Sequence, residues 1–220
     1  MQMQKFAQIS GTAAPMMKAN IDTDVIIPAK RLVGHKREEL AAFAFEAHRY
    51  RPDGSDNPDF VLNMPRYRGA SVLITGENFG CGSSRESAVW AMAGFGFRCV
   101  VAPGFGDIFY NNAFQNGMLL IRLPKEQVER LAAELESGAA PSMTVDLQEQ
   151  VITAPSGRQT RFEIDAERRQ ALLEGRDEIG MTLARDMDIL AFQERDRVAR
   201  PWIYETSPRN EPAWAAIASG

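Results

Sequence analysis

Residues 71–102 read Ser-Val-Leu-Ile-Thr-Gly-Glu-Asn-Phe-Gly-Cys-Gly-Ser-Ser-Arg-Glu-Ser-Ala-Val-Trp-Ala-Met-Ala-Gly-Phe-Gly-Phe-Arg-Cys-Val-Val-Ala and have the pattern of a β-strand, a helix and a second β-strand. The two strands, residues 71–75 and 98–102, are nearly continuous apolar runs, which is typical of parallel strands covered on both faces. The helix covers about residues 84–94, and Gly94 and Gly96 end it. This order predicts a βαβ unit with a right-handed crossover.

The rest of the chain places further elements around this unit. After it, we expect a helix over residues 107–116, a strand over 118–122 and a helix over 125–136. Alternating apolar and polar residues then predict antiparallel strands over 143–147, 150–154 and 159–164, followed by helices over about 166–173 and 184–199. Before it, we expect a strand over 5–9, a turn at 11–15, a helix over 36–49 and a loop over 51–58.

These elements predict an α/β fold, in which a mainly parallel central sheet is followed by a second, antiparallel sheet. A chain of 220 residues can bury one sizeable core. We therefore expect a single domain over residues 1–200. Residues 201–220 form a C-terminal tail, which either docks on a neighbour or frays.

The composition limits the classes of function. A hydrophobic fraction of 45% and a charged fraction of 25% are typical of a soluble globular protein, and a net charge of −4 gives no general attraction to nucleic acid or to an anionic membrane. We expect neither a membrane span nor a secretory signal, and the two cysteines fit a reducing cytoplasm. Cys81 and Cys99, with His35 and His48, cannot supply the ligands of an iron–sulfur cluster or a structural zinc site. Any metal must come from another chain.

An acidic segment precedes an apolar run at residues 20–28. Asn20, Asp22 and Asp24 alternate as calcium ligands do, but the glycine and the distal glutamate of an EF-hand loop are missing. Asn and Asp side chains more often build turns by bonding to nearby backbone groups. We therefore expect a structural turn here.

The turn Gly80-Cys-Gly-Ser-Ser-Arg-Glu86 concentrates reactive and charged side chains. Its glycines allow a tight turn close to a ligand, and the helix start behind it offers free N–H groups to an anion. Ser83 and Glu86 have the spacing of a capping box, in which the Ser83 hydroxyl caps the helix and Glu86 bonds back. The helix start also favours the thiolate of Cys81, although cysteines are more often buried fillers, as we expect for Cys99.

Four interpretations of this turn are weighed from the residues alone. A dinucleotide site would lack its third glycine, and no acidic residue closes the next strand. A nucleophile, Ser83 or Cys81, has no histidine near it in the sequence. A carboxylate site, with Arg85 pairing with the ligand and a serine hydroxyl acting on it, accommodates every residue type present. In a purely structural interpretation, Ser83 only caps the helix and Arg85 forms a solvated pair with Glu86.

An ordered series of motifs resembles a known family. The motifs are Asn20-Ile-Asp-Thr-Asp-Val-Ile-Ile-Pro28, Pro58-Asp-Phe-Val-Leu-Asn63, Asn78-Phe-Gly-Cys-Gly-Ser-Ser-Arg-Glu86, Asp107-Ile-Phe-Tyr-Asn-Asn112, Asn116-Gly117 and Asp177-Glu-Ile-Gly-Met-Thr-Leu183. They resemble, in order from about residue 5 to 195, the small subunits of bacterial 3-isopropylmalate dehydratases in the aconitase superfamily. The resemblance implies a three-layer β/β/α swivelling domain.

The resemblance also implies a reaction and a partner. The family interconverts 2-isopropylmalate and 3-isopropylmalate, which are hydroxy di-acids, by dehydration and rehydration in leucine biosynthesis. A large subunit carries a 4Fe-4S cluster, whose iron acts as a Lewis acid on the departing hydroxyl. This chain is therefore expected to bind no cofactor itself and to be active only with the large subunit.

Site residues follow from the matching motif. Ser83 would be the base that removes the proton next to a carboxylate, and Gly82, Ser84 and Arg85 would bind the substrate. The segment after Pro28, which holds Lys30, Arg31 and Arg37, falls where the family's substrate-selecting segment lies. Arg31 is the candidate taken from that segment.

Two departures from the family's usual pattern concern the substrate. The chain reads Arg85-Glu-Ser-Ala-Val-Trp90 where Arg-Glu-His-Ala-Pro-Trp is usual, and Gly104-Phe-Gly-Asp107 where Ser-Phe-Ala-Asp is common. Ser83, Ser84 and Arg85 are intact, so the reaction class stands. A related dehydratase acting on a methylated malate or on citraconate stays open, as do a non-catalytic subunit of the same fold and a hydrolase that needs no partner.

Overall fold

The computed structural model describes residues 3–83, 85–137, 140–183 and 185–204. The chain divides into two compact units, Met1–Asp177 and Glu178–Gly220. The first unit contains the sheet and the turn at residues 80–86.

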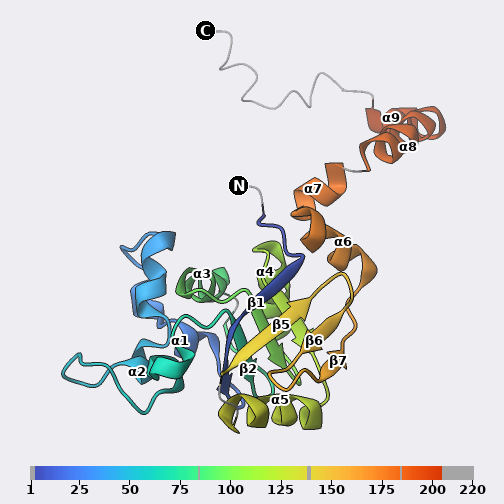
Figure 1. Ribbon diagram of the computed structural model, residues 1–220. Helices are drawn as coiled ribbons and strands as arrows, with labels where there is room; N and C mark the ends of the chain where they lie inside the picture. Colours follow the sequence, from blue (N-terminus) through green and yellow to red (C-terminus); the bar gives the residue numbers. More distant parts are fainter. Residues whose placement is uncertain (1–2, 84, 138–139, 184, 205–220) are drawn as a thin grey trace. The chain divides into compact units, whose positions relative to one another are not determined.

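One seven-stranded sheet forms the centre of the first unit, in the order β4-β3-β2-β1-β5-β6-β7 (Figure 1). The strands are β1 (Gln8–Met16), β2 (Val72–Thr75), β3 (Cys99–Ala102), β4 (Leu119–Arg122), β5 (Ser142–Asp146), β6 (Val151–Thr153) and β7 (Gln159–Arg161). β1 to β4 pair in parallel, whereas β1, β5, β6 and β7 pair antiparallel. The predicted parallel and antiparallel sheets are both present, and β1 joins them.

The predicted βαβ pattern is confirmed. The helices that follow β2, β3 and β4 are α3 (Glu86–Phe95), α4 (Asp107–Gln115) and α5 (Lys125–Ser137). Leu73 pairs with Val100, and both pack with Met92 of α3 in the core. Because successive strand residues point to opposite faces, Val72 and Ile74 lie on the other face, where α5 packs against β1, β2 and β3.

β1 differs from what the sequence suggested. The strand expected over 5–9 is misplaced, since β1 begins only at Gln8, and the turn expected at 11–15 is wrong, because β1 runs through it without interruption. Ala13 donates its N–H to the residue before β5 at 2.8 Å, so the nitrogen of Pro15, two residues on, points to the same side. Pairing with β5 has already ended at Thr12. Pro15 therefore removes no bond from the sheet.

Short helices cover the region between β1 and β2. They are α1 (Thr23–Ile26), α2 (Glu46–Arg49) and the 3-10 helices η1 (Ala29–Arg31), η2 (Arg37–Phe43), η3 (Val61–Asn63) and η4 (Pro65–Tyr67). The single helix predicted over 36–49 is wrong, since Phe45 interrupts it with a left-handed backbone at φ 55°. The Phe45 ring is fully buried, and its N–H donates to the Ile26 carbonyl at 2.8 Å. Burial of a large aromatic side chain outweighs the helix propensity of its neighbours here.

The antiparallel part of the sheet leads into helix α6 (Ala166–Glu174). Asp165 caps this helix by accepting a hydrogen bond from the Arg168 N–H at 3.0 Å, and Gly175 ends it. The Phe6 N–H donates to the Leu172 carbonyl at 2.9 Å, which ties the segment before β1 to α6. The helix predicted over about 166–173 is confirmed.

The second unit contains three helices in the part that is described. They are α7 (Glu178–Leu183), α8 (Asp186–Ala199) and α9 (Pro201–Tyr204). α8 is the helix expected over 184–199. The tail expected over 201–220 begins with α9, and residues 205–220 lie outside the described part of the chain. Within the described residues of both units, every helix is too short or too polar to cross a membrane.

Candidate active site

The turn between β2 and α3 lies at the carboxyl ends of the parallel strands, where α/β sheets commonly bind ligands. Gly80 and Gly82 both have a left-handed backbone, with φ values of 73° and 88°. A Cβ atom on Gly80 would lie 2.2 Å from the ring of Phe109, and the Gly80 N–H donates to the Ile21 carbonyl at 2.7 Å. The tight turn predicted from these glycines is confirmed.

The segment after β1 holds this turn in place. Thr23 is buried, its N–H donates to the Cys81 carbonyl at 3.0 Å, and its hydroxyl donates to the Ser83 carbonyl at 3.0 Å. Asp22 caps α1 by accepting a hydrogen bond from the Val25 N–H at 2.7 Å. Asp22 therefore builds a turn, as expected.

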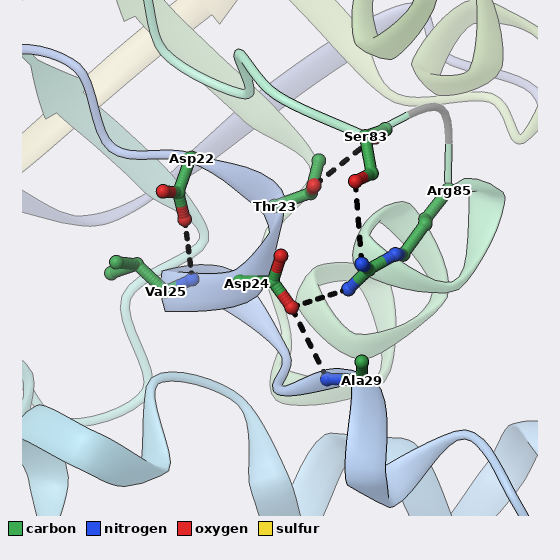
Figure 2. A network of polar contacts seen from close by, with 7 residues as sticks. All are labelled: Asp22, Thr23, Asp24, Val25, Ala29, Ser83 and Arg85. Carbon is green, nitrogen blue, oxygen red and sulfur yellow. Dashed lines mark hydrogen bonds and ion pairs between the residues drawn. The ribbon is translucent and has the colours of Figure 1, made fainter.

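The side chains of Ser83, Arg85 and Asp24 meet on the outside of this turn (Figure 2). Arg85 Nη2 donates to Ser83 Oγ at 3.3 Å, and Nη1 donates to Asp24 Oδ1 at 2.5 Å. The same Asp24 oxygen accepts the Ala29 N–H at 3.3 Å. The hydrogen bond from Arg85 holds the pKa of Asp24 below its usual range, so the carboxylate is charged at neutral pH.

The capping box predicted for Ser83 and Glu86 is wrong. α3 begins after Arg85, and the Arg85 side chain makes no capping hydrogen bond to it. The Glu86 carboxylate instead accepts from Trp90 Nε1 at 3.2 Å and from Asn116 Nδ2 at 2.8 Å. The Ser83 hydroxyl is therefore not engaged in capping and faces the Arg85 guanidinium.

The other predicted site residues fall in different places. Gly82 lies within the turn, and Ser84 lies outside the described residues. Arg31 Nε donates to Glu46 Oε2 at 2.8 Å, and its guanidinium lies 4.4 Å from the centre of the Phe43 ring. The charge of Arg31 is thus engaged by a structural carboxylate that is only 11% exposed.

Asp24 belongs to this site, although its sequence motif suggested only a turn. Asp22 alone caps α1, which leaves the Asp24 carboxylate available for another partner. That partner, Arg85, lies 61 residues further along the chain. The alternation of Asn20, Asp22 and Asp24 in the sequence was the available signal, and it did not indicate which distant cation Asp24 would bind.

A hollow of about 440 Å³ opens beside the start of the turn. Its lining residues are Ala19, Asn20, Glu77, Asn78, Gly104 and Phe105, which follow β1, β2 and β3. Asn78 Nδ2 donates to Asn20 Oδ1 at 2.8 Å across this hollow's edge. A carboxylate placed in it would meet the like charge of Glu77, so Arg85 is the better anion-binding group at this end of the sheet.

The cysteines of the chain do not fit an iron–sulfur cluster, which is normally held by four thiolates. Cys99 is fully buried in β3, and burial raises the pKa of its thiol. Cys81 is half-buried in the turn. Among residues 3–83, 85–137, 140–183 and 185–204, no three His, Cys, Asp or Glu side chains are grouped so as to hold a metal ion.

Comparison with known proteins relates this chain to two protein families. The Aconitase C-terminal domain family matches residues 3–126, which is more than half of the chain. The LeuD_N family matches residues 129–166.

Relatives named 3-isopropylmalate dehydratase small subunit match nearly the whole chain. The protein of Afipia carboxidovorans is 50% identical over 201 residues, covering 91% of this chain and 100% of the relative. That of Dinoroseobacter shibae is 51% identical over 201 residues with the same coverage, and that of Gluconacetobacter diazotrophicus is 52% identical over 200 residues, covering 91% and 97%.

A solved structure supports the same relationship. The crystal structure of 3-isopropylmalate dehydratase (leuD) from Methanocaldococcus jannaschii superposes with a TM-score of 0.61 at 26% identity, covering 84% of this chain and 99% of that one. The chain belongs to the family of 3-isopropylmalate dehydratase small subunits.

Proposed function

We propose that this chain is the small subunit of a cytoplasmic hydro-lyase that interconverts 2-isopropylmalate and 3-isopropylmalate in leucine biosynthesis. Ser83 acts as the base, and Arg85, with Gly82 and Ser84, binds the substrate. The observation that carries the proposal is the contact of one guanidinium with both a serine hydroxyl and a carboxylate, at 3.3 Å and 2.5 Å.

The chemistry of the proton transfer explains why this contact is useful. A hydrogen on the carbon next to a carboxylate is a very weak acid, so its removal needs a strong base and stabilisation of the charge that develops. Arg85 lies close enough to Ser83 Oγ to favour the negatively charged form of that oxygen. In the forward step the substrate proton goes to Ser83 Oγ, and rehydration returns it.

The pair with Asp24 supports a carboxylate site at Arg85. Asp24 Oδ1 shows where an anionic oxygen rests against Nη1 of this guanidinium (Figure 2). An arginine has five N–H donors, so Arg85 retains donors for a substrate carboxylate. The turn before α3 adds backbone N–H groups at a helix start, which also favour an anion.

The proposal requires a large subunit as partner. The cysteines and histidines of this chain do not fit a 4Fe-4S cluster, so we assign the cluster to that subunit. The small subunit contributes the base and the carboxylate contacts, and hydroxyl departure is left to its partner. A heterodimer is the simplest assembly in which both halves of the site are present.

Replacement of Ser83 tests the base assignment. We expect Ser83→Ala, in a complex reconstituted anaerobically with the large subunit and iron, to lower kcat for 3-isopropylmalate by about 10²- to 10⁴-fold, with KM changed little. Ser156→Ala is the matched control, because Ser156 is exposed on the turn between β6 and β7, where its hydroxyl bonds to Glu134 and accepts the Arg158 N–H. Near-normal turnover of Ser83→Ala would show that another group is the base.

The same preparation separates the alternative functions. Conversion of a methylated malate or citraconate, but of neither isopropylmalate, would assign the chain to a related dehydratase. A non-catalytic subunit would assemble normally and tolerate both Ser83→Ala and Arg85→Lys. A hydrolase would act without iron or partner. Val89, one of the departures from the family pattern, is fully buried in the hydrophobic core, so that change places no side chain on the surface of the site.

A further inference from the structure

The side-chain amide of Asn116 connects three elements around the turn. Its Oδ1 accepts from Arg37 Nη2 at 2.8 Å and from Trp90 Nε1 at 3.1 Å. Its Nδ2 donates to Glu86 Oε1 at 2.8 Å and to the Asn112 carbonyl at 2.9 Å. Both N–H donors and both acceptor positions of the amide are therefore used.

Only one of these four bonds serves the helix that Asn116 terminates. Asn116 follows the last residue of α4, whose end it caps with its backbone N–H, and its side chain adds the bond to the Asn112 carbonyl. The bonds to Glu86 and Trp90 reach α3, and the bond to Arg37 reaches the start of η2. A role beyond capping is indicated by this use of the amide.

The segment 29–37 is fixed to the catalytic turn at its near end. The Ala29 N–H donates to Asp24 Oδ1 at 3.3 Å, and the same oxygen binds Arg85 at 2.5 Å (Figure 2). One carboxylate oxygen therefore joins the beginning of this segment to the proposed substrate-binding arginine.

The far end of the segment is fixed to the next residue of the same turn. Arg37 binds Asn116, and Asn116 binds Glu86, which directly follows Arg85 in the sequence. The Arg37 guanidinium also lies 4.9 Å from the centre of the Trp90 ring, so its position over α3 is defined by a second contact. Two polar links thus tie both ends of segment 29–37 to residues 85 and 86.

We propose that Asn116 is a positioning residue for the reaction, which holds the far end of segment 29–37 against the turn that carries Ser83 and Arg85. The inference rests on the proposed function, because that function makes this turn the site of substrate binding. Segment 29–37 also contains Lys30, whose ammonium pairs with Glu46 Oε1 at 3.2 Å while the side chain stays 71% exposed. Loss of the Asn116 link should weaken substrate binding more than it slows the chemical step.

A double-mutant cycle in the reconstituted complex tests the link. We expect Asn116→Ala and Arg37→Ala each to raise KM for 3-isopropylmalate by about 5- to 30-fold while kcat changes less than about 3-fold, and we expect the double variant to be no worse than the poorer single variant. Asn111→Ala is the matched control, since Asn111 also lies on α4 and also accepts a hydrogen bond from an arginine, Arg168, at 2.7 Å. Additive effects of the two substitutions, or a normal KM for Asn116→Ala, would overturn the proposal.

If Asn116→Ala does not fold, a pair of substitutions that moves the negative charge from Glu86 to Asn116 tests the same link. Asn116→Asp keeps the oxygen that accepts from Arg37 but places a carboxylate oxygen against Glu86, so KM should rise. Glu86→Gln supplies a donor to that oxygen, and the variant with both substitutions should recover most of the loss. Absence of recovery in a folded double variant would contradict the proposed link.

Limited trypsin digestion of the isolated chain separates this inference from the proposed function. If the wild-type complex converts no isopropylmalate, the proposed function fails, but the position of segment 29–37 can still be measured. Release of its far end should speed cleavage after Lys36 and Arg37 by about fivefold in Asn116→Ala and not in Asn111→Ala, as identified by mass spectrometry of the fragments. Equal cleavage rates would show that Asn116 does not hold the segment.

Discussion

At the scale of single residues, Asp24 is the acid that orients the proposed substrate-binding arginine. We expect Asp24→Asn to lower kcat/KM for 3-isopropylmalate about 5- to 20-fold, because a neutral amide holds Arg85 beside Ser83 less firmly than a carboxylate does. The free energy of unfolding should change by less than about 1 kcal/mol, since the Asp24 side chain is 52% exposed. Steady-state kinetics and chemical denaturation measure the two quantities.

Asp22→Asn provides the control for this prediction. It is the same substitution two residues away, and asparagine caps a helix as well as aspartate does, so the cap on α1 should survive. Equal losses of activity in Asp22→Asn and Asp24→Asn would mean that any change in this segment disturbs the turn. Only a selective loss in Asp24→Asn supports a specific role for the ion pair.

The pH dependence of this pair has a defined sign. The hydrogen bond from Arg85 lowers the pKa of Asp24 in the folded chain. The stabilising contribution of the pair is therefore fully present above the usual carboxyl pKa of about 3.9, and it is lost as the pH falls through the lowered folded value. The small difference in unfolding free energy between wild type and Asp24→Asn should accordingly disappear in strong acid.

At the scale of elements, the connection between β3 and α4 packs directly against the turn at residues 80–86. A Cβ atom on Gly106 would lie 2.5 Å from the Gly80 carbonyl oxygen, whereas one on Gly104 would meet nothing closer than 3.7 Å. We expect Gly106→Ala to lower kcat by about 10- to 100-fold, because it displaces the backbone that leads to Ser83. Gly104→Ser, the matched control, should leave kcat within about twofold. Both changes restore residues common in the family, so equal and small effects would show that the turn adjusts freely.

The sequence predicted those elements whose local pattern agrees with their environment. Residues 71–102 were assigned correctly because β2 and β3 are buried on both faces, and such strands are uninterrupted apolar runs. The helix over 36–49 failed because the buried ring of Phe45 forces a left-handed residue into a segment of good helix formers. The turn predicted at 11–15 was wrong because Pro15 lies in β1 beyond the end of its pairing with β5, where a proline is tolerated. Only the strand pairing reveals this.

The site was predictable to the extent that it is contiguous in sequence. Ser83 and Arg85 lie in one motif, and the structure brings their side chains together. Asp24 lies 61 residues from its partner Arg85, and Asn116 lies 30 residues from its partner Glu86. No local spacing in the sequence predicts such contacts. The capping box failed for the same reason, since Glu86 binds the distant Asn116 instead of the backbone before it.

At the scale of the whole molecule, the first unit is organised by the strand that its two half-sheets share. β1 pairs in parallel with β2 and antiparallel with β5, so the α/β half and the antiparallel half form one sheet. The carboxyl ends of β1 and β2 lead to the two segments that meet in the site, the one at residues 22–24 and the one at residues 80–85. The central strand pair therefore fixes the distance between Asp24 and Arg85, which belong to separate parts of the sequence.

Removal of the iron tests the proposal that the large subunit alone binds the cluster. If the cluster belongs entirely to the large subunit, a chelator and air should abolish turnover of the complex and leave the thermal unfolding temperature of the isolated small subunit unchanged within about 1 °C.

Cys81 is the one thiol near the site with partial exposure, so Cys81→Ala tests whether this chain contributes a ligand. We expect the Cys81→Ala complex to retain its iron content, measured by colorimetric assay and by the visible absorbance of the cluster. A stoichiometric loss of iron in that variant, with the complex still assembled, would show that the small subunit supplies one cluster ligand and would require a different assignment of the site.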